Sequence, residues 1–472
     1  MKKKYLLFLI LWLTGLETAS AQFTDLHNFN DTSGSGPSSP LVISGKTMFG
    51  ATSGGGLYAN GIIYSIDTNG NNFKVLYTFD STFSYSVNSG PVCGLTLVGN
   101  KLYGTTYQLG SLGNGNIFSI DTDGTNYKDL LDFNITNGQM PNGYLVYSFG
   151  KLYGMTFQGG AHNGGLVFSI DTNGNNYKDL LDFGGANGLS PQGSLTIYNN
   201  KLYGPTQDGG AYGYGTLFSL DTDGTGYKKL HDFNDTTGAN PAGGLVALNN
   251  KLYGIAEWKD IFYAGYIFAI DTDGSNYKNI HRLNDTDADM NGSLIYNNGT
   301  LYGMATAGGI YSSGELISLD TTGSSFKEFF TFNDTDGFNL ENGKLTFYNN
   351  TLYGVAYQGG PYQYYGLVFK FRNSEVSTSV KELKPTAGAI SVYPNPGNGV
   401  FTASISGSNT QEEITNVEVY NILGEKVYAN QTVIHTSQFL INLSSQPGGV
   451  YLYRIIAQNG DLLGEGKLII RK

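Results

Sequence analysis

The chain has 472 residues, of which only 14% are charged, while aromatic residues make up a further 14%. With 67 glycines and 35 tyrosines, this composition is typical of many short strands joined by tight turns, in two or three domains. The formal net charge of -11 argues against nucleic acid or an anionic membrane as a partner, and a single cysteine, Cys93, excludes an intramolecular disulfide framework.

The N-terminus has the layout of a signal peptide. Three lysines precede the apolar run Tyr5–Leu13, and Ala19-Ser20-Ala21 forms an A-x-A cleavage site. A transmembrane helix needs about 20 apolar residues, and this run is shorter. We therefore expect cleavage after Ala21 and a mature protein with no transmembrane segment.

A repeated phrase dominates the chain that follows. Leu-Tyr-Gly recurs six times between Leu102 and Gly354, and Met48-Phe49-Gly50 is a degenerate first copy. The glycines of successive copies lie 49 to 54 residues apart. Such a period indicates seven copies of one structural unit.

Each unit contains four apolar segments. The Asn199-Asn200 and Asp223-Gly224 pairs are hairpin-turn signals between them. Four antiparallel strands per unit, repeated seven times, are typical of the blades of a β-propeller. In the copy that ends at Phe233 the four segments are Ser194–Tyr198, Lys201–Thr206, Thr216–Leu220 and Tyr227–Phe233.

The two ends of the repeat region complement each other. The seventh unit stops at Phe371 without a fourth segment, while Thr24–Asn30, before the first unit, matches Tyr227–Asn234. An N-terminal strand that completes the last blade closes the ring and leaves no exposed edge. The sequence thus predicts an all-β chain with a seven-bladed β-propeller over residues 22–372.

The unit resembles the GloVer-type tandem repeat of bacterial exported proteins. The resemblance rests on the Leu-Tyr-Gly phrase, on Gly-Gly pairs such as Gly209-Gly210, and on phrases such as Phe118-Ser119-Ile120-Asp121-Thr122-Asp123-Gly124. It implies a propeller on an exported surface protein and no assigned chemistry.

The C-terminal region is predicted to be a separate domain. Residues 373–388 lack strand periodicity and are expected to be a linker, and short alternating segments over residues 389–472 favour a small Ig-like β-sandwich. Four phrases there resemble the type A C-terminal sorting domain of the type IX secretion system: Tyr393-Pro394-Asn395-Pro396, Tyr420-Asn421, Gly449-Val450-Tyr451 and Gly466-Lys467. The resemblance implies export by signal peptide and type IX secretion, with that machinery as a partner, to the extracellular space or outer-membrane surface of a Gram-negative bacterium.

Candidate ligand-binding residues lie in loops that strand order places on one face of the propeller. Aromatic rings beside Asn, Gln and Asp suit sugars, although each ring could instead pack between blades. Trp258 is the strongest candidate because its loop departs from the Gly-Gly form of its neighbours. The candidates are Trp258, Tyr212, Tyr214, Phe262, Tyr263, Tyr362 and Tyr364.

No cofactor is expected, with calcium as the alternative. Asp121-Thr122-Asp123-Gly124 and its copies repeat acidic oxygens, but the late glutamate of a calcium loop is missing and turn formation explains them. A second set, Asn234-Asp235-Thr236 and its copies at Asn284 and Asn333, could place a ring of oxygens around a cation.

The sequence shows no catalytic constellation. His27, His231 and His281 share one strand position, and no Ser/His/Asp set or zinc spacing can be assembled. We therefore predict a monomeric, non-catalytic binding propeller for glycan or extracellular polymer. The alternatives are a polysaccharide lyase or hydrolase with its site in the channel, and a structural or protein-protein interaction module.

Overall fold

The structure is a computed structural model that describes residues 22–80, 90–91, 94–241, 243–257, 265–283, 290, 292–306, 308–340, 343–362, 364–372, 389–406, 414–421, 426–430, 438–457 and 462–471. The predicted signal peptide and linker, and Cys93, lie outside these ranges. Every regular element within them is a β-strand. Across the same ranges no helix has the length and apolar character needed to cross a membrane. The chain divides into two compact units, Met1–Val376 and Ser377–Lys472.

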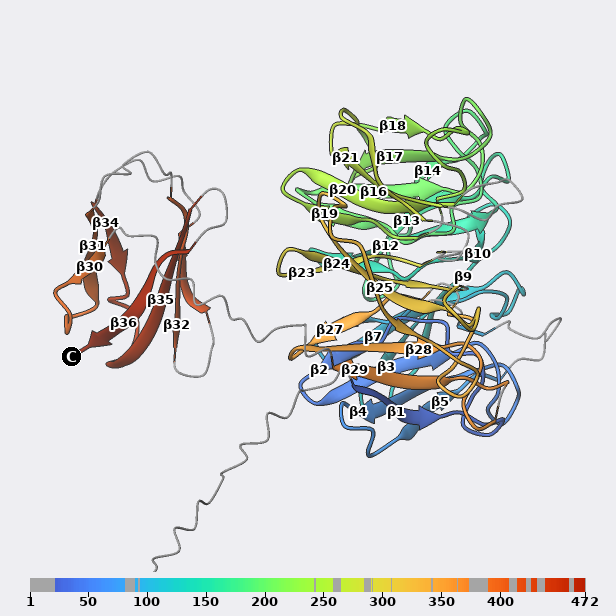
Figure 1. The fold of residues 1–472 in the computed structure, drawn as a ribbon, viewed down its shortest axis with the longest axis horizontal. Coiled ribbons are helices and arrows are strands. Elements are labelled where there is room, and N and C mark those ends of the chain that lie inside the picture. The colour runs from blue at the N-terminus through green and yellow to red at the C-terminus, as the bar shows by residue number, and fades with distance from the viewer. Residues whose placement is uncertain are drawn as a thin grey trace, which may run out of the picture. The chain divides into compact units, whose positions relative to one another are not determined.

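The strands of the first unit form seven antiparallel sheets in the described residues, here called sheets 1 to 7 in chain order, each built on four principal strands (Figure 1). The first strands are β2 (Val42–Ser44), β6 (Thr96–Val98), β11 (Val146–Ser148), β15 (Thr196–Tyr198), β19 (Val246–Leu248), β23 (Ile295–Asn297) and β27 (Thr346–Tyr348). The second strands are β3 (Thr47–Thr52), β7 (Lys101–Thr106), β12 (Lys151–Gln158), β16 (Lys201–Thr206), β20 (Lys251–Ala256), β24 (Thr300–Ala305) and β28 (Thr351–Ala356).

The third and fourth strands complete each sheet. The third strands are β4 (Ile62–Asp67), β8 (Asn116–Asp121), β13 (Leu166–Asp171), β17 (Thr216–Asp221), β21 (Tyr266–Asp271), β25 (Glu315–Asp320) and β29 (Leu367–Arg372). The fourth strands are β5 (Lys74–Thr78), β9 (Lys128–Asp132), β14 (Lys178–Asp182), β18 (Lys228–Asp232), β22 (Lys278–Arg282), β26 (Lys327–Thr331) and, for sheet 7, β1 (Gln22–Asn28). Sheet 3 has one additional short strand, β10 (Gln139–Pro141), paired with β12.

The predicted hairpin turns are present in sheet 4. Asn199 and Asn200 both have positive φ, 48° and 60°, as a two-residue turn between β15 and β16 requires. The second predicted segment coincides with β16, whereas the first and fourth are longer than β15 and β18. Phe233, just beyond β18, is nevertheless fully buried, so apolar patterning extends past the hydrogen-bonded strand.

The glycine of the Leu-Tyr-Gly phrase is explained by close packing. A Cβ atom on Gly204 would lie 2.8 Å from Cζ of Phe218, the aromatic residue opposite it on β17. Leu202 is fully buried and Tyr203 nearly so. The phrase therefore supplies two core side chains and a space for a phenylalanine ring.

Strand β1 joins the last sheet, as the orphan N-terminal segment predicted. It pairs antiparallel with β29, with Phe23 opposite Phe371 and Asn28 opposite Leu367. Figure 1 shows β1, in dark blue, beside the orange strands β28 and β29. The sheet therefore combines the first and last strands of the unit, and β29 has a partner on each side.

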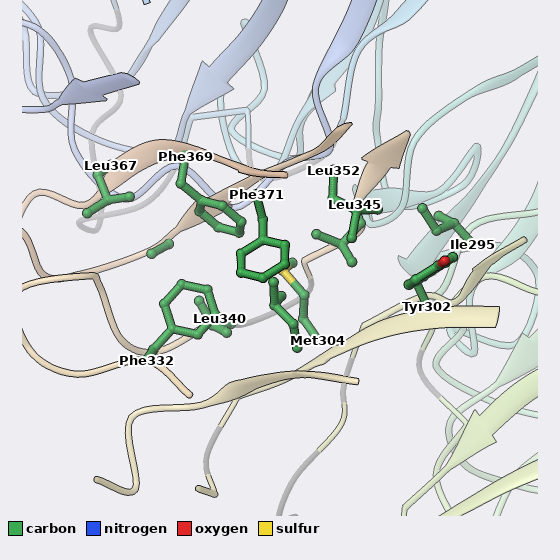
Figure 2. Packing of buried hydrophobic residues seen from close by; sticks show 12 residues of the cluster. Ile295, Tyr302, Met304, Phe332, Leu340, Leu345, Leu352, Leu367, Phe369 and Phe371 are labelled. Atoms are coloured by element: carbon green, nitrogen blue, oxygen red, sulfur yellow. The ribbon is translucent and has the colours of Figure 1, made fainter. Parts of the chain in front are cut away.

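Apolar clusters join each sheet to the next and sheet 7 to sheet 1. Figure 2 shows the cluster between sheets 6 and 7, where Met304 and Phe332 face Phe369 and Phe371. Five further clusters connect sheets 1 to 6 in chain order. The last cluster combines Tyr353 of sheet 7 with Met48 of sheet 1. Burial is thus distributed over contacts between neighbouring sheets, which recur around the unit.

The second unit consists of two sheets that share one apolar core. One contains β30 (Ala389–Tyr393), β31 (Val400–Ser406) and β34 (Gln438–Asn442). The other contains β33 (Lys426–Asn430), β32 (Ile414–Asn421), β35 (Gly449–Ala457) and β36 (Leu462–Ile470). Phe401 and Ile441 from the first sheet pack with Val419, Ile455 and Leu468 from the second.

Candidate functional site

One face of the first unit carries the loops between second and third strands together with the connections between sheets. Antiparallel order places both kinds of loop at the same ends of the strands, and backbone bridges tie them, as between Ala239 and Glu257. We call this the loop face. The opposite face, which carries the hairpin turns, is the turn face.

A pocket of about 530 Å³ opens between sheets 1 and 2 on the loop-face side. We call it the Tyr58 pocket. Its lining residues are Tyr58, Tyr77, Phe79, Asp80, Leu109, Gly110, Ser111, Asn116, Tyr127 and Asp129.

Aromatic rings form one wall of the Tyr58 pocket. Tyr77 of β5 and Tyr127 of sheet 2 stack with their ring centroids 4.0 Å apart and nearly parallel planes. Phe79 packs edge-on against both. Tyr58, in the loop between β3 and β4, remains 53% exposed. The pocket therefore combines a fixed aromatic wall with one solvent-accessible ring.

Polar side chains line most of the rest, together with Leu109 and Gly110. Asp129 accepts a 3.0 Å hydrogen bond from the amide of Asn116, whose own oxygen accepts a 2.6 Å bond from Thr106. The hydroxyl of Ser111 donates to Asp132, just behind the lining. Asp80 is exposed at the edge. These side chains present mainly acceptors to the pocket.

Burial and negative charge shift the pKa values of these groups in one direction. Burial raises the pKa of Asp129; the Asn116 hydrogen bond lowers it, and the neighbouring Asp132 carboxylate raises it again. Burial also raises the pKa of Tyr77, with further contributions from Asp80 and Asp129. Both shifts arise from burial and from neighbouring carboxylates, and the acidic side chains Asp80 and Asp129 make the pocket better suited to neutral, hydroxyl-rich ligands than to anions.

Comparison with known protein families gives two matches. The Gloeobacter/Verrucomicrobia repeat matches residues 81–263 and 213–415, which together cover more than half of the chain. The chain belongs to the Gloeobacter/Verrucomicrobia repeat family. The secretion system C-terminal sorting domain matches residues 391–471. This repeat protein therefore carries a type IX sorting domain, which directs it to the cell surface or the extracellular space.

Solved structures resemble the repeat protein only distantly. The extracellular domain of a protein assigned as a one component system from B. thetaiotaomicron is 12% identical with a TM-score of 0.47, covering 96% of this chain and 58% of its own. Polysaccharide lyase Uly1 is 10% identical with a TM-score of 0.45, covering 74% and 91%. The GH43B protein of a Bacteroides ovatus xyloglucan locus is 10% identical with a TM-score of 0.31, covering 94% and 92%. The chain thus spans about three fifths of the first of these, and no match was found among the curated proteins.

The predicted site residues do not gather at one place in the described part of this repeat protein. Tyr212 and Tyr362 lie at the tips of their loops, 61% and 53% exposed, and Tyr364 is 69% exposed. Tyr214 is partly buried and packs against the cluster between sheets 4 and 5. Trp258, Phe262 and Tyr263 lie outside the described residues.

Exposed side chains do recur at one repeat position. This position is the second after the Gly-Gly pair of the loop, or after the counterpart of that pair. In five sheets the side chain there is more than half exposed: Tyr58, Leu112, Tyr212, Tyr311 and Tyr362. They surround the loop face from different sheets. The predicted residues Tyr212 and Tyr362 are thus equivalents of Tyr58, which is not among the site residues predicted from the sequence.

The loop of sheet 2 carried a signal that was also missed. Leu109-Gly110 replaces the Gly-Gly pair found at Gly209-Gly210 of sheet 4. Leu109 is almost fully buried, in the cluster between sheets 1 and 2, and lines the Tyr58 pocket. The loop of sheet 2, like the Trp258 loop, therefore departs from the Gly-Gly sequence of the other repeats.

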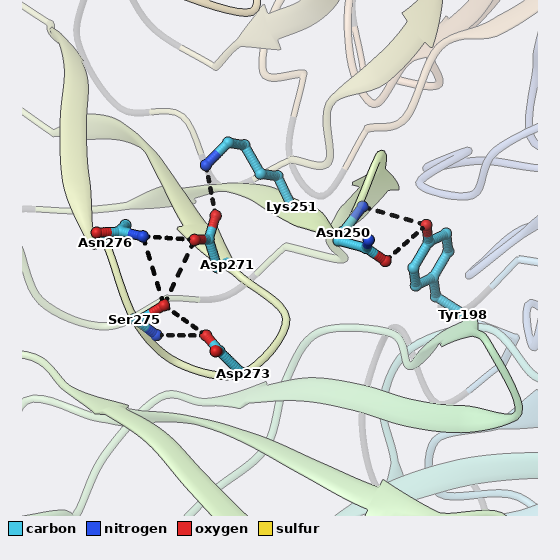
Figure 3. A network of polar contacts seen from close by, with 7 residues as sticks. All are labelled: Tyr198, Asn250, Lys251, Asp271, Asp273, Ser275 and Asn276. Carbon is cyan, nitrogen blue, oxygen red and sulfur yellow. Dashed lines mark hydrogen bonds and ion pairs between the residues drawn. The ribbon is translucent and has the colours of Figure 1, made fainter. Parts of the chain in front are cut away.

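The acidic turns are held by donors of their own repeat. In Figure 3, Asp271 accepts from Lys251 and from Asn276, the latter at 2.7 Å, and Asp273 accepts from the backbone and hydroxyl of Ser275. Asn234 on the loop face likewise accepts three bonds from Thr236 and Thr237. Within the described ranges, no group of three or more His, Cys, Asp or Glu side chains could hold a metal ion.

The three equivalent histidines lie in fourth strands, as expected. Each stacks on the aromatic residue that precedes the fourth strand of the following sheet. His231 lies 3.9 Å from the ring of Tyr277, and the planes differ by 1°. Their position is structural, between sheets.

Proposed function

We propose that the seven sheets are the blades of a closed β-propeller and that the protein is an exported, monomeric, non-catalytic binding protein for glycan or an extracellular polymer. Two observations support a closed ring. Apolar clusters connect each sheet to the next and sheet 7 to sheet 1, and β1 pairs with β29. The two-sheet C-terminal unit is proposed to be an Ig-like sandwich. No resident cofactor is part of the proposal.

The Tyr58 pocket is the observation that carries the binding proposal. Sugars present apolar faces and hydroxyl edges, so they bind where an aromatic surface adjoins acceptors. The stacked pair Tyr77 and Tyr127 supplies a rigid surface, and Asp129 supplies an oriented acceptor. Tyr58 adds a second ring that is accessible to a ligand, because more than half of its surface is exposed.

Repetition of the tip residues favours binding to a polymer. Tyr212, Tyr311 and Tyr362 share the repeat position of Tyr58 and are comparably exposed. One chain of sugar that contacts several tips gains affinity through effective concentration, even when each contact is weak. Many copies on one cell would add to this effect.

A glycan array with the purified protein tests the proposal. Bound glycans would then be titrated against Tyr58→Ala and, as a matched control, Phe149→Asn. Phe149 is a 92% exposed aromatic on the turn face, at a position with positive φ where other sheets carry asparagine. We expect Tyr58→Ala to weaken binding about tenfold or more and Phe149→Asn to leave it unchanged.

Three outcomes would contradict parts of this proposal. An array with no bound glycan would reject carbohydrate as the ligand and favour a protein partner or a structural role. Shortened sugar chains in the product would reject the non-catalytic assignment and favour a lyase or hydrolase. Binding that is lost with a chelator and restored by calcium would reject the cofactor-free assignment.

A further inference from the structure

A second place on the loop face brings together residues from three distant sheets. Every sheet has one residue directly before the buried leucine that leads into its first strand. We call these seven the pre-leucine residues: Pro40, Gly94, Tyr144, Ser194, Gly244, Ser293 and Lys344. Tyr144 and Lys344 are the large members, and the others are small.

Neighbouring pre-leucine residues contact one another from sheet to sheet. The backbone N–H of Tyr144 donates to the hydroxyl of Ser194 at 2.9 Å, and that of Gly244 donates to the hydroxyl of Ser293 at 2.7 Å. Ser293 forms a backbone bridge with Lys344. These seven positions therefore lie close together, beside the first strands.

The side chains of Tyr144 and Lys344 meet although 200 residues separate them. The ammonium group donates to the phenolic oxygen at 2.7 Å and lies 4.8 Å from the ring centroid. A Cβ atom on Gly244 would lie 3.2 Å from that phenolic oxygen and 3.2 Å from the hydroxyl oxygen of Ser293. Sheets 3, 5 and 7 thus each contribute a residue to one cluster of side chains. Because Gly244 has no side chain, the Tyr144 and Ser293 hydroxyls can lie close to its backbone.

Hydrogen-bond donors outnumber acceptors at this spot. Lys344 has no ion-pair partner among the described residues, and Tyr144 accepts its bond without a partner there for its own hydroxyl hydrogen. Within the same described ranges, Ser194 and Ser293 also act only as acceptors of backbone bonds, so no partner is found there for their hydroxyl hydrogens. The Ser194 carbonyl, 3.5 Å from the Gly244 Cβ position, is an acceptor at the same place.

We propose that the pre-leucine residues bind an oxyanion group, the carboxylate or sulfate of an acidic saccharide. Lys344 would supply the charge, Tyr144 and Ser293 the hydroxyl donors, and the Ser194 carbonyl an acceptor for an adjacent sugar hydroxyl. Charge-assisted bonds of this kind are the strongest available at a partly buried site. The site is separate from the Tyr58 pocket, where Asp80 and Asp129 disfavour anions.

Calorimetric titration of the purified protein with trigalacturonate, its methyl ester and inorganic sulfate tests this proposal. We expect trigalacturonate or sulfate to bind, and the neutral ester to bind at least about tenfold more weakly than trigalacturonate if the carboxylate is the ligand group. Lys344→Met should weaken binding about tenfold, Tyr144→Phe about threefold, and Lys344→Arg least. Lys46→Met, which removes one exposed lysine from the turn face, is the charge control and should have no effect.

The outcomes separate this site from the Tyr58 pocket. Oxyanion binding that survives Tyr58→Ala but not Lys344→Met supports the proposal, whatever the result of the glycan array. Equal losses with Lys344→Met and Lys46→Met would overturn it, because overall charge would then be the cause. Absence of binding to both trigalacturonate and sulfate, with unchanged thermal unfolding of each variant, would also overturn it.

Discussion

At the scale of single residues, equivalent positions in the seven sheets can be compared with one another. Sheets 2, 3, 4 and 5 place Phe118, Phe168, Phe218 and Phe268 at one third-strand position, whereas sheet 1 has Tyr64 there. The Tyr64 side chain is fully buried, and its hydroxyl has no hydrogen-bond partner in the part of the chain that the structure describes. A buried hydroxyl without a partner costs the free energy of its lost hydration.

Tyr64→Phe is therefore expected to stabilise the protein. Removal of the unpartnered hydroxyl should raise the free energy of unfolding by about 1–2 kcal/mol. The reverse change, Phe118→Tyr, places a hydroxyl against Gly104 and should lower it. Thermal or denaturant unfolding measures both, and equal stability of wild type and Tyr64→Phe would show that the hydroxyl is satisfied.

The stacked histidines predict a pH-dependent loss of stability. Burial lowers the pKa of His27 and of His231 from 6.5 to about 4. The unfolded chain therefore binds more protons between these values, so stability is complete above pH 6.5 and falls as the pH drops from 6.5 towards 4.

Leucine at the histidine positions should remove part of this dependence. Leu131 and Leu181 occupy the same position in sheets 2 and 3, so His231→Leu should cost less than about 1.5 kcal/mol at pH 8. Denaturant unfolding at pH 8 and pH 5 should show a smaller difference for His231→Leu than for wild type. His162→Leu, at an exposed loop position, should retain the full difference.

At the scale of elements, one phrase of the sorting domain fastens the last strand. The Asn395 side chain donates to the Lys467 carbonyl at 2.5 Å and accepts from the Ile469 N–H at 2.9 Å. The backbone of Gly397 also bonds β36 and the residue beyond it. Two phrases that lie 70 residues apart in the sequence are therefore parts of one structural clip.

Loss of the Asn395 side chain should free the end of β36. Asn395→Ala removes two hydrogen bonds and should destabilise the C-terminal unit by about 2 kcal/mol. Amide exchange at Ile469 would then quicken, and less protein would reach the cell surface or medium. Asn398→Ala, which removes a single long bond to Val400, is the matched control. Normal export of an Asn395→Ala protein with fast exchange would separate the clip from secretion.

At the scale of the whole molecule, stability depends on the two ends of the repeat region meeting. The Thr346 hydroxyl of sheet 7 donates to the Leu41 carbonyl, just before sheet 1, at 2.7 Å, and β1 completes sheet 7 by pairing with β29. Without β1, strand β29 would expose an unpaired edge and the apolar cluster around Phe23 would open.

The position of β1 in the sequence should matter less than its presence. Deletion of residues 22–30 should abolish cooperative thermal unfolding of the first unit or cause aggregation. A variant that carries the same residues after Arg372, joined by the turn sequence Thr222–Gly226, should regain cooperative unfolding. The moved strand can then pair with β29 as the next strand in the chain, which is how fourth strands follow third strands in the other sheets. Failure of the moved strand to restore cooperative unfolding would show that the N-terminal connection itself is required.

Much of the fold could be read from local pattern. Repetition of Leu-Tyr-Gly indicated the number of units, two-residue turns such as Asn199-Asn200 indicated hairpins, and the unmatched segment around Leu26 indicated its pairing with the last unit. These features depend on chemistry within a few residues, or on comparing one repeat with another. The type IX sorting domain was recognisable for the same reason, because its phrases occur in order along the chain.

The candidate sites depended on tertiary structure. Tyr58 and Tyr127 come from different repeats, and Tyr144 and Lys344 lie 200 residues apart. Whether an aromatic residue packs inside, as Tyr214 does, or stands in solvent, as Tyr212 does, depends on the neighbouring sheet. The sequence alone determined the repeat, its strands and the sorting domain because these follow from local pattern. Only packing between sheets decided which side chains converge, since convergence requires contacts between distant parts of the chain.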